Sequence, residues 1–132
     1  MISDQEFDHP AITAEVAEIF DRYEAALRDN DIETLNDFFL PRTTTVRYGL
    51  GEHNYGAEEI ARYRQSASPI HPRRRILKVV IATFGADAAV VSAEFASPDS
   101  AFIGRQSQTW IRVAAGWKIA AAHVSAIDPA AL

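Results

Sequence analysis

The stretch AFIGRQSQTWIRV, residues 101–113, is followed by AAG and then by WKIAAAHVSAID, residues 117–128. Two runs rich in β-branched and aromatic residues around a short glycine-containing turn predict a pair of antiparallel strands. A half-buried strand should alternate apolar with polar residues, and a fully buried one should be mostly aliphatic. Residues 104–109 have no aliphatic side chain at all. This polar run indicates a sheet that lines a polar cavity or a wet interface.

The strand register of this hairpin decides which polar side chains share a face. If Ala115-Gly116 is a two-residue turn, Gln108 lies opposite His123, and both side chains would line a pocket on one face. Arg105 would then lie on the other face, unless a bulge or a longer turn brings it into the pocket. A single extra loop residue would reverse the assignment.

Upstream of the hairpin, helical patterns come first and strand patterns follow. Apolar residues at spacings of three and four, with proline and asparagine at the ends, predict three helices: residues 12–27 with Pro10 in the first turn, a short helix capped by Asn30 that ends before Pro41, and residues 57–66. Runs rich in β-branched residues predict three further strands: residues 43–49, 76–84 and 88–95.

The predicted order is therefore α-α-β-α-β-β-β-β. With 132 residues, of which 48% are hydrophobic, the chain can bury one sizeable core, so we expect a single domain over residues 1–132. Helices grouped early and long strands grouped late indicate an α+β fold, in which the helices pack on one face of a curved antiparallel sheet and enclose a pocket.

Composition excludes several classes of function. The chain has 13 Lys and Arg against 18 Asp and Glu, a net charge of −5, which disfavours nucleic acid and anionic membranes as partners. It has no cysteine, and its four histidines are scattered without the spacing of a metal site. There is no phosphate-binding or dinucleotide-binding glycine motif, no basic secretory signal and no long apolar run. We expect a cytoplasmic protein without metal or cofactor.

Two residues outside the hairpin are candidates for chemistry. Tyr23 lies on the apolar stripe of the first predicted helix, either as a core tyrosine or as a proton donor that faces a cavity. Arg47 follows Val46 in a β-branched strand, so it either faces solvent or, if it points inward, must be paired with an anion. With no acidic residue expected nearby, an inward Arg47 would bind a carboxylate-bearing ligand.

For other polar residues the sequence allows either a structural or a functional role. His123 is either a hydrogen-bonded structural histidine or a titrating, ligand-binding one. The triplet Arg73-Arg74-Arg75 is predicted to form the solvent-exposed start of a strand, although one of the three side chains could point towards a pocket.

Four segments together resemble a known family: YEAAL at 23–27, TVRYGLGEHNYG at 45–56, GRQSQTW at 104–110 and GWKIAAAHVS at 116–125. They are similar to the AtzH/HpxZ family, a bacterial branch of the nuclear transport factor two-like (SnoaL-like) superfamily. The resemblance extends over residues 11–128. It implies a cone-shaped α+β fold with a curved sheet and three N-terminal helices around a pocket, and a homodimer through the outer face of the sheet.

The resemblance also implies an activity. Members are encoded beside amidase-signature enzymes that degrade ureides, and the AtzH-like reaction converts 1,3-dicarboxyurea to allophanate in cyanuric acid catabolism. Tyr23 and Arg47 match the catalytic pair of that family, which uses no cofactor. We expect Gln108, His123 and Arg105 to contact the small anionic ureide.

Two alternatives to this activity stay open. One is a non-catalytic, HpxZ-like role in which the protein binds a ureide or accompanies an amidase in oxalurate catabolism. The other is a proton-shuttling isomerase or dehydratase, which is disfavoured because residues 103–127 contain no acidic residue.

Overall fold

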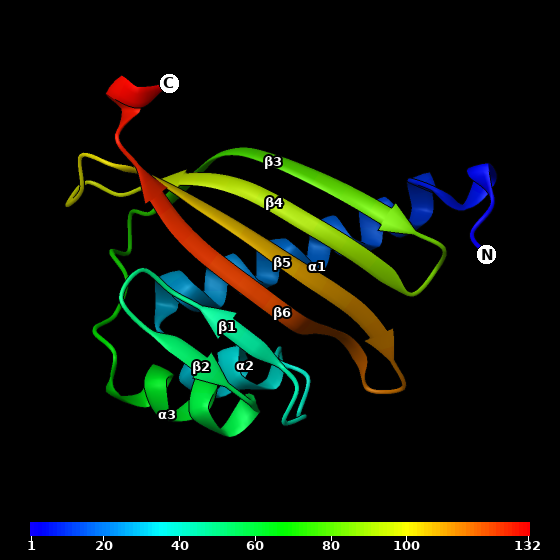
Figure 1. Ribbon diagram of the computed structural model, residues 1–132, viewed down its shortest axis with the longest axis horizontal. Helices are drawn as coiled ribbons and strands as arrows, with labels where there is room; N and C mark the ends of the chain where they lie inside the picture. Colours follow the sequence, from blue (N-terminus) through cyan, green and yellow to red (C-terminus); the bar gives the residue numbers. More distant parts are fainter.

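The computed structural model describes residues 1–132, and Figure 1 shows their arrangement. Its helices and strands are, in chain order, α1 (Pro10–Asp29), α2 (Ile32–Asp37), β1 (Val46–Tyr48), β2 (His53–Tyr55), α3 (Ala57–Ser66), β3 (Arg75–Phe84), β4 (Ala88–Ala96), β5 (Ile103–Val113) and β6 (Gly116–Ile127). Short 3₁₀ turns lie near both ends, Asp4–Glu6 and Pro129–Ala131. None of the helices has the length and apolarity that a membrane crossing requires.

All six strands form one sheet in the order β2-β1-β6-β5-β4-β3. Neighbouring strands are antiparallel except β1 and β6, which run parallel, so the sheet is mixed. Figure 1 shows the long strands curving past α1, with α2, α3 and the β1–β2 ribbon gathered at one end. The α+β class, the three helices and the curved sheet are confirmed, and β2 is a short strand within the segment predicted as a loop.

The ends of the first two helices follow from local chemistry. Pro10 opens α1, where its missing N–H costs nothing, and the His9 side chain accepts a hydrogen bond from the Ala11 N–H. Asn30 ends α1 in the left-handed conformation, at φ 52°. Because Asn30 is used there, Asp31 caps α2 and accepts from the Thr34 N–H. The predicted cap of the second helix was therefore wrong by one residue.

The hydrophobic core fills the space between α1 and the inner face of the sheet. Its largest fully buried side chain is Trp110 of β5. The Glu15 carboxylate on α1 accepts a 2.8 Å hydrogen bond from the indole N–H of Trp117 on β6, which fixes the helix against the hairpin. The whole core consists of Val16, Phe20, Tyr23, Ala26, Leu27, Leu35, Phe39, Ile60, Ala89, Val91, Ala93, Trp110, Trp117, Ile119 and Ala122.

The register of the last hairpin differs from the prediction. Val113 pairs with Gly116, so the turn is Ala114-Ala115, and Gly116 takes a φ of +115° that suits glycine. The register shifts again between Thr109 and Trp110, where β6 contributes one extra residue. Beyond this bulge Gln108 pairs with Ala122, so the predicted pairing of Gln108 with His123 is wrong.

Candidate functional site

The polar run of β5 alternates between the two faces of the sheet. Gln106 and Gln108 point inward and are buried, whereas Arg105 and Ser107 are exposed on the outer face. The Oε1 atom of Gln108 accepts a 3.0 Å hydrogen bond from the indole N–H of Trp110. The inner face of the hairpin is therefore polar inside the protein, which is the cavity-side arrangement that the sequence allowed.

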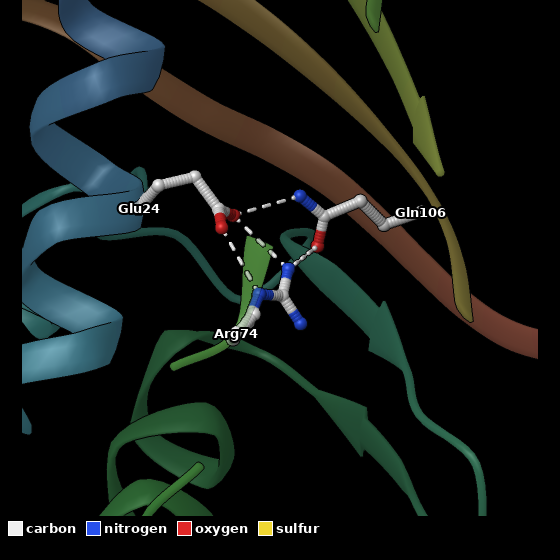
Figure 2. Close-up of polar contacts among 3 residues, drawn as sticks. All are labelled: Glu24, Arg74 and Gln106. Atoms are coloured by element: carbon white, nitrogen blue, oxygen red, sulfur yellow. Dashed lines mark hydrogen bonds and ion pairs between the residues drawn. The ribbon is translucent and has the colours of Figure 1, made fainter. Parts of the chain in front are cut away.

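A hydrogen-bonded network, shown in Figure 2, joins three elements of the interior. The Arg74 guanidinium, in the turn before β3, donates to both carboxylate oxygens of Glu24 on α1, at 3.0 Å each. Arg74 also donates to the side-chain oxygen of Gln106, and the Gln106 amide donates to Glu24 at 3.1 Å. We call Glu24, Arg74 and Gln106 the paired network. Of the predicted arginine triplet, Arg74 is the buried member.

A glycine makes room for this network. The Arg74 guanidinium carbon lies 3.6 Å from the centroid of the Phe95 ring. A Cβ atom at Gly104 would lie 2.1 Å from the same ring, so only glycine lets Phe95 lie flat against β5. The glycine of the GRQSQTW segment thus supports the surface on which Arg74 rests.

Tyr23 lies beside the paired network on α1 and is only 3% exposed. Its ring packs edge-on against Phe38, Phe39 and Trp110, at centroid distances of 5.8, 6.5 and 6.1 Å. Its hydroxyl makes no hydrogen bond to a protein group, and its oxygen is not among the fully buried atoms that lack a partner. A tyrosine whose ring is buried normally uses its hydroxyl in a hydrogen bond, so this hydroxyl is open to water or to a small ligand.

The charges around Tyr23 are mostly positive. Burial raises the pKa of its phenol, although Arg64, Arg47 and Arg74 oppose the shift and Glu24 adds to it. The phenol therefore keeps its proton at neutral pH, and a phenolate formed there would have cations nearby. This combination suits a proton donor.

Arg47 points inward from β1 and is 8% exposed, as the inward alternative required. Its Nη1 atom donates to Oε1 of Glu52 at 2.6 Å. The expectation that no acidic residue lies near Arg47 was therefore wrong. The loop folds back through a 2.9 Å hydrogen bond from the Gly49 N–H to the Glu52 carbonyl, and a Cβ at Gly49 would lie 1.8 Å from the Glu52 carboxylate.

The Glu52 carboxylate is held in its ionised form. Partial burial works against ionisation, but hydrogen bonds from Arg47, from the Gly51 N–H and from Tyr63 bring the pKa of Glu52 below its usual value. One of the five N–H groups of Arg47 is used in this ion pair, and the others are free for a second acceptor.

Two further buried polar residues lie near Arg47, and sequence reasoning missed both. Arg64 on α3 is 9% exposed and makes no ion pair or hydrogen bond with another protein group. The Oδ1 atom of Asn54 on β2 is buried without a partner, and Asn54 pairs with Arg47 across the β1–β2 ribbon. The signal for Arg64 was its place four residues after the buried Ile60, on the same face of the helix.

We call Tyr23, Arg47, Asn54 and Arg64 the open cluster, because three of them have polar groups without a protein partner. The guanidinium carbons of Arg47 and Arg64 lie 4.7 and 5.7 Å from the centroid of one ring, that of Tyr63, so the two cations are neighbours. No group of three His, Cys, Asp or Glu side chains is arranged to hold a metal ion. The cluster can bind an anion and offer it a proton.

The structure does not bring His123 and Arg105 to the open cluster. His123 is exposed on the outer face, and its ring packs edge-on against Tyr48 at 5.5 Å. Arg105 donates to the Ser125 hydroxyl at 3.2 Å and lines an outer cleft of about 370 Å³. The predicted placement of His123 in the pocket was wrong, since the Ala114-Ala115 turn and the bulge reverse its direction. The homodimer through this outer face stays a prediction.

A smaller cleft reaches Arg74 of the paired network but, like the outer cleft, is lined by no residue of the open cluster. It measures about 200 Å³, and Arg74, Phe95, Gly104 and Leu50 are among its lining residues. Leu50 belongs to the loop that carries Glu52, so the cleft borders both the paired network and the Arg47 loop. The larger outer cleft contains neither Tyr23 nor Arg47. The unpartnered interior groups, rather than cleft size, locate the candidate site.

The sequence pattern of a family described as AtzH-like matches residues 5–130 of the chain. Among the curated proteins there is no match. Two solved structures are similar in both sequence and fold. One is a protein of unknown function from Pectobacterium atrosepticum, with 41% identity, 97% of this chain and 100% of that chain covered, and a TM-score of 0.93.

The second structure is a cystatin-like fold protein from Burkholderia xenovorans, with 46% identity, 93% of this chain and 97% of that chain covered, and a TM-score of 0.91. An NTF2-like protein of unknown function from Pseudomonas putida is 16% identical over 96% of this chain and 90% of its own, with a TM-score of 0.72. This more distant likeness shows the fold alone, and the fold it shows is the NTF2-like one expected from the sequence.

Proposed function

The chain belongs to the AtzH-like family, and from this premise we propose that it removes an N-carboxyl group from a small carboxylated urea. The substrate we favour is 1,3-dicarboxyurea, and the product is allophanate. The observation that carries the proposal is the unpartnered hydroxyl of Tyr23, buried beside Arg47 and Arg64. A protonated phenol among cations suits an anionic substrate that must gain a proton.

In the proposed step, the bond between a urea nitrogen and its carboxyl carbon breaks. The electron pair stays on the nitrogen, Tyr23 gives its proton to that nitrogen, and carbon dioxide leaves. The dianion plus one proton becomes the monoanion allophanate plus carbon dioxide. Solvent then returns a proton to Tyr23, and the neighbouring arginines stabilise the phenolate in the meantime.

Arg47 has the geometry to position the substrate. Its guanidinium is buried on one side by the Tyr63 ring at 4.7 Å and donates one N–H to Glu52. The remaining N–H groups can hold a substrate carboxylate in two parallel hydrogen bonds. Holding the substrate in one orientation beside the proton donor supplies much of the rate enhancement in reactions of this kind.

The paired network argues against the isomerase alternative. Such enzymes need a carboxylate that is free to take a proton. Glu24 is the buried acid of the interior, and both of its oxygens accept hydrogen bonds from Arg74 while one also accepts from Gln106. A carboxylate held in this way is a weak general base.

Turnover of 1,3-dicarboxyurea tests the proposal. The substrate is generated in place by a partner amidase, and the rate of allophanate formation is compared with the spontaneous rate. We expect Tyr23→Phe and Arg47→Ala each to lower the catalysed rate by about 10²-fold to 10⁴-fold. Tyr48→Phe is the matched control, because it removes a hydroxyl from an exposed tyrosine next to Arg47.

The result also separates catalysis from binding alone. If the two site variants turn over substrate as fast as the unmodified protein, the catalytic assignment is wrong. If the protein binds the ureide, co-purifies with an amidase and leaves the spontaneous rate unchanged, the accessory role is correct instead.

A further inference from the structure

Arg64 is a buried cation whose partner is missing from the protein. It lies in the last turn of α3, is 9% exposed and has no acidic or hydrogen-bonding partner among the protein groups. By contrast, the guanidiniums of Arg47 and Arg74 each pair with a carboxylate. An unpaired charge in the interior is costly, so proteins normally pair it or use it.

Asn54 supplies a second unpartnered group, on the strand that pairs with the Arg47 strand. It is 7% exposed, and its Oδ1 atom has no hydrogen-bond donor. Asn54 and Arg47 are directly paired residues of adjacent antiparallel strands, so their side chains point to the same side of the ribbon. That side is the interior, because both residues are buried.

These groups are complementary to one chemical fragment. A guanidinium without a partner calls for an anionic oxygen, and an amide oxygen without a partner calls for an N–H donor. An N-carboxylated urea carries both in adjacent positions, as –NH–COO⁻. A simple carboxylic acid satisfies only the guanidinium.

We infer that Arg64 and Asn54 form a second subsite that binds the carboxylate and the adjacent N–H of a doubly charged ureide. The inference rests on the proposed function and deepens it. Of the two N-carboxyl groups in the substrate, one leaves as carbon dioxide and the other remains in the product. Arg47 and Arg64, both near the Tyr63 ring, give each carboxylate its own guanidinium.

The two-carboxylate requirement follows from the charges. Arg47, Arg64 and Arg74 bring three positive charges to the interior, whereas Glu24 and Glu52 bring two negative ones. A ligand here is favoured by its negative charge, and one that reaches both Arg47 and Arg64 gains two ion pairs. A small dicarboxylate should therefore bind better than a monocarboxylate of the same shape.

Binding of a stable dicarboxylate tests the inference without any turnover. Glutarate carries two carboxylates joined by three methylene groups, and its monoamide replaces one of them with a neutral group of the same shape. We expect the unmodified protein to bind glutarate about tenfold to 100-fold more tightly than the monoamide, measured by titration calorimetry. In Arg64→Gln this preference should fall to about threefold or less, because the second carboxylate then has no guanidinium of its own.

Arg62→Gln is the matched control, since it removes the same charge from an exposed position two residues away on α3. It should keep the preference of the unmodified protein. Arg64→Lys should keep part of it, because lysine retains the charge without the bidentate geometry.

Each outcome is decisive. The inference is overturned if Arg64→Gln keeps the preference, if Arg62→Gln loses it equally, or if the unmodified protein does not bind glutarate. It is also overturned if Arg64→Gln fails to fold, which would show that the guanidinium has a structural partner. A clear preference for glutarate without turnover of dicarboxyurea would support this subsite and refute the proposed reaction.

Discussion

Two groups of buried polar residues each include one of two adjacent residues on α1, and they differ in whether their polar atoms have partners within the protein. Glu24 belongs to the paired network, in which the carboxylate, the guanidinium of Arg74 and the amide of Gln106 all bind one another. Tyr23 belongs to the open cluster, in which its hydroxyl and the guanidinium of Arg64 have no protein partner. Burial is similar in both, so burial alone does not identify the functional site.

The presence or absence of a hydrogen-bonding partner within the protein distinguishes polar groups that stabilise the fold from those available to a ligand. A polar group whose partners lie within the protein stabilises the fold, and its removal leaves those partners stranded in the interior. A polar group without partners adds little to the folded state and is available to a ligand. Removing a guanidinium from the paired network should therefore mainly lower stability. Removing one from the open cluster should mainly weaken ligand binding.

The largest effect is expected from Arg74→Met, which breaks the paired network. Removing the guanidinium leaves Glu24 and Gln106 buried without their cation, which should lower the free energy of unfolding by about 3–5 kcal/mol. Arg75→Met is the control, because Arg75 is exposed and should change stability by about 0.5 kcal/mol or less. Urea unfolding of both variants measures the difference. Equal, small losses would show that the network does not stabilise the fold.

The next effect concerns Glu52, which binds Arg47 where we expect a ligand. Glu52→Gln removes a carboxylate that competes with an incoming anion for the same guanidinium. We expect glutarate to bind about tenfold more tightly at pH 7, measured by titration calorimetry. Glu58→Gln, an exposed change on α3, should have no such effect. Weaker binding in Glu52→Gln would mean that Glu52 instead holds Arg47 in its binding orientation.

Much of the fold follows from local patterns in the sequence. The bounds of α3 at Ala57–Ser66, the end of α1 at Asn30 and the four long strands were predictable, because periodicity, caps and turns are set by neighbouring residues. The register of the last hairpin was not. It depends on which residue of the turn takes a positive φ and on one bulge. Each changes the strand pairing by one residue and so moves the side chains beyond it to the other face of the sheet.

The site was predictable in part, for a similar reason. The sequence identified Arg47 and Tyr23 as candidates but left two alternatives open for each, and the structure shows Arg47 inside and the Tyr23 ring buried. Glu52 was missed because a loop return brings it back to Arg47, and strand periodicity does not describe loops. Arg64 was missed because a charged residue in a helix is usually assumed to face solvent, and its position on the buried face of α3 was not considered.

A smaller effect should appear in the pH dependence of stability. The pKa of Glu52 is lowered in the folded protein by Arg47, so its ion pair stabilises the fold above the unfolded value of about 4.5 and loses that contribution as the pH falls through the folded value. The carboxylate is a quarter exposed, so we expect less than about 1 kcal/mol. Unfolding at pH 7 should show the unmodified protein more stable than Glu52→Gln, and the difference in unfolding free energy should shrink as the pH falls below about 4.5. A difference that does not change with pH would show that it arises from packing rather than from the ion pair.

The smallest effect is expected from Arg64→Met, which makes in the open cluster the change that Arg74→Met makes in the paired network. Two opposing terms act here. Removing an unpaired buried charge favours the folded state, and losing a cation at the end of α3 disfavours it slightly, because that charge interacts well with the helix dipole. Methionine keeps most of the apolar stem, so the net change in unfolding free energy should be within about 0.5 kcal/mol of zero. If Arg64→Met lowers the free energy of unfolding as much as Arg74→Met does, Arg64 stabilises the fold and is not reserved for a ligand.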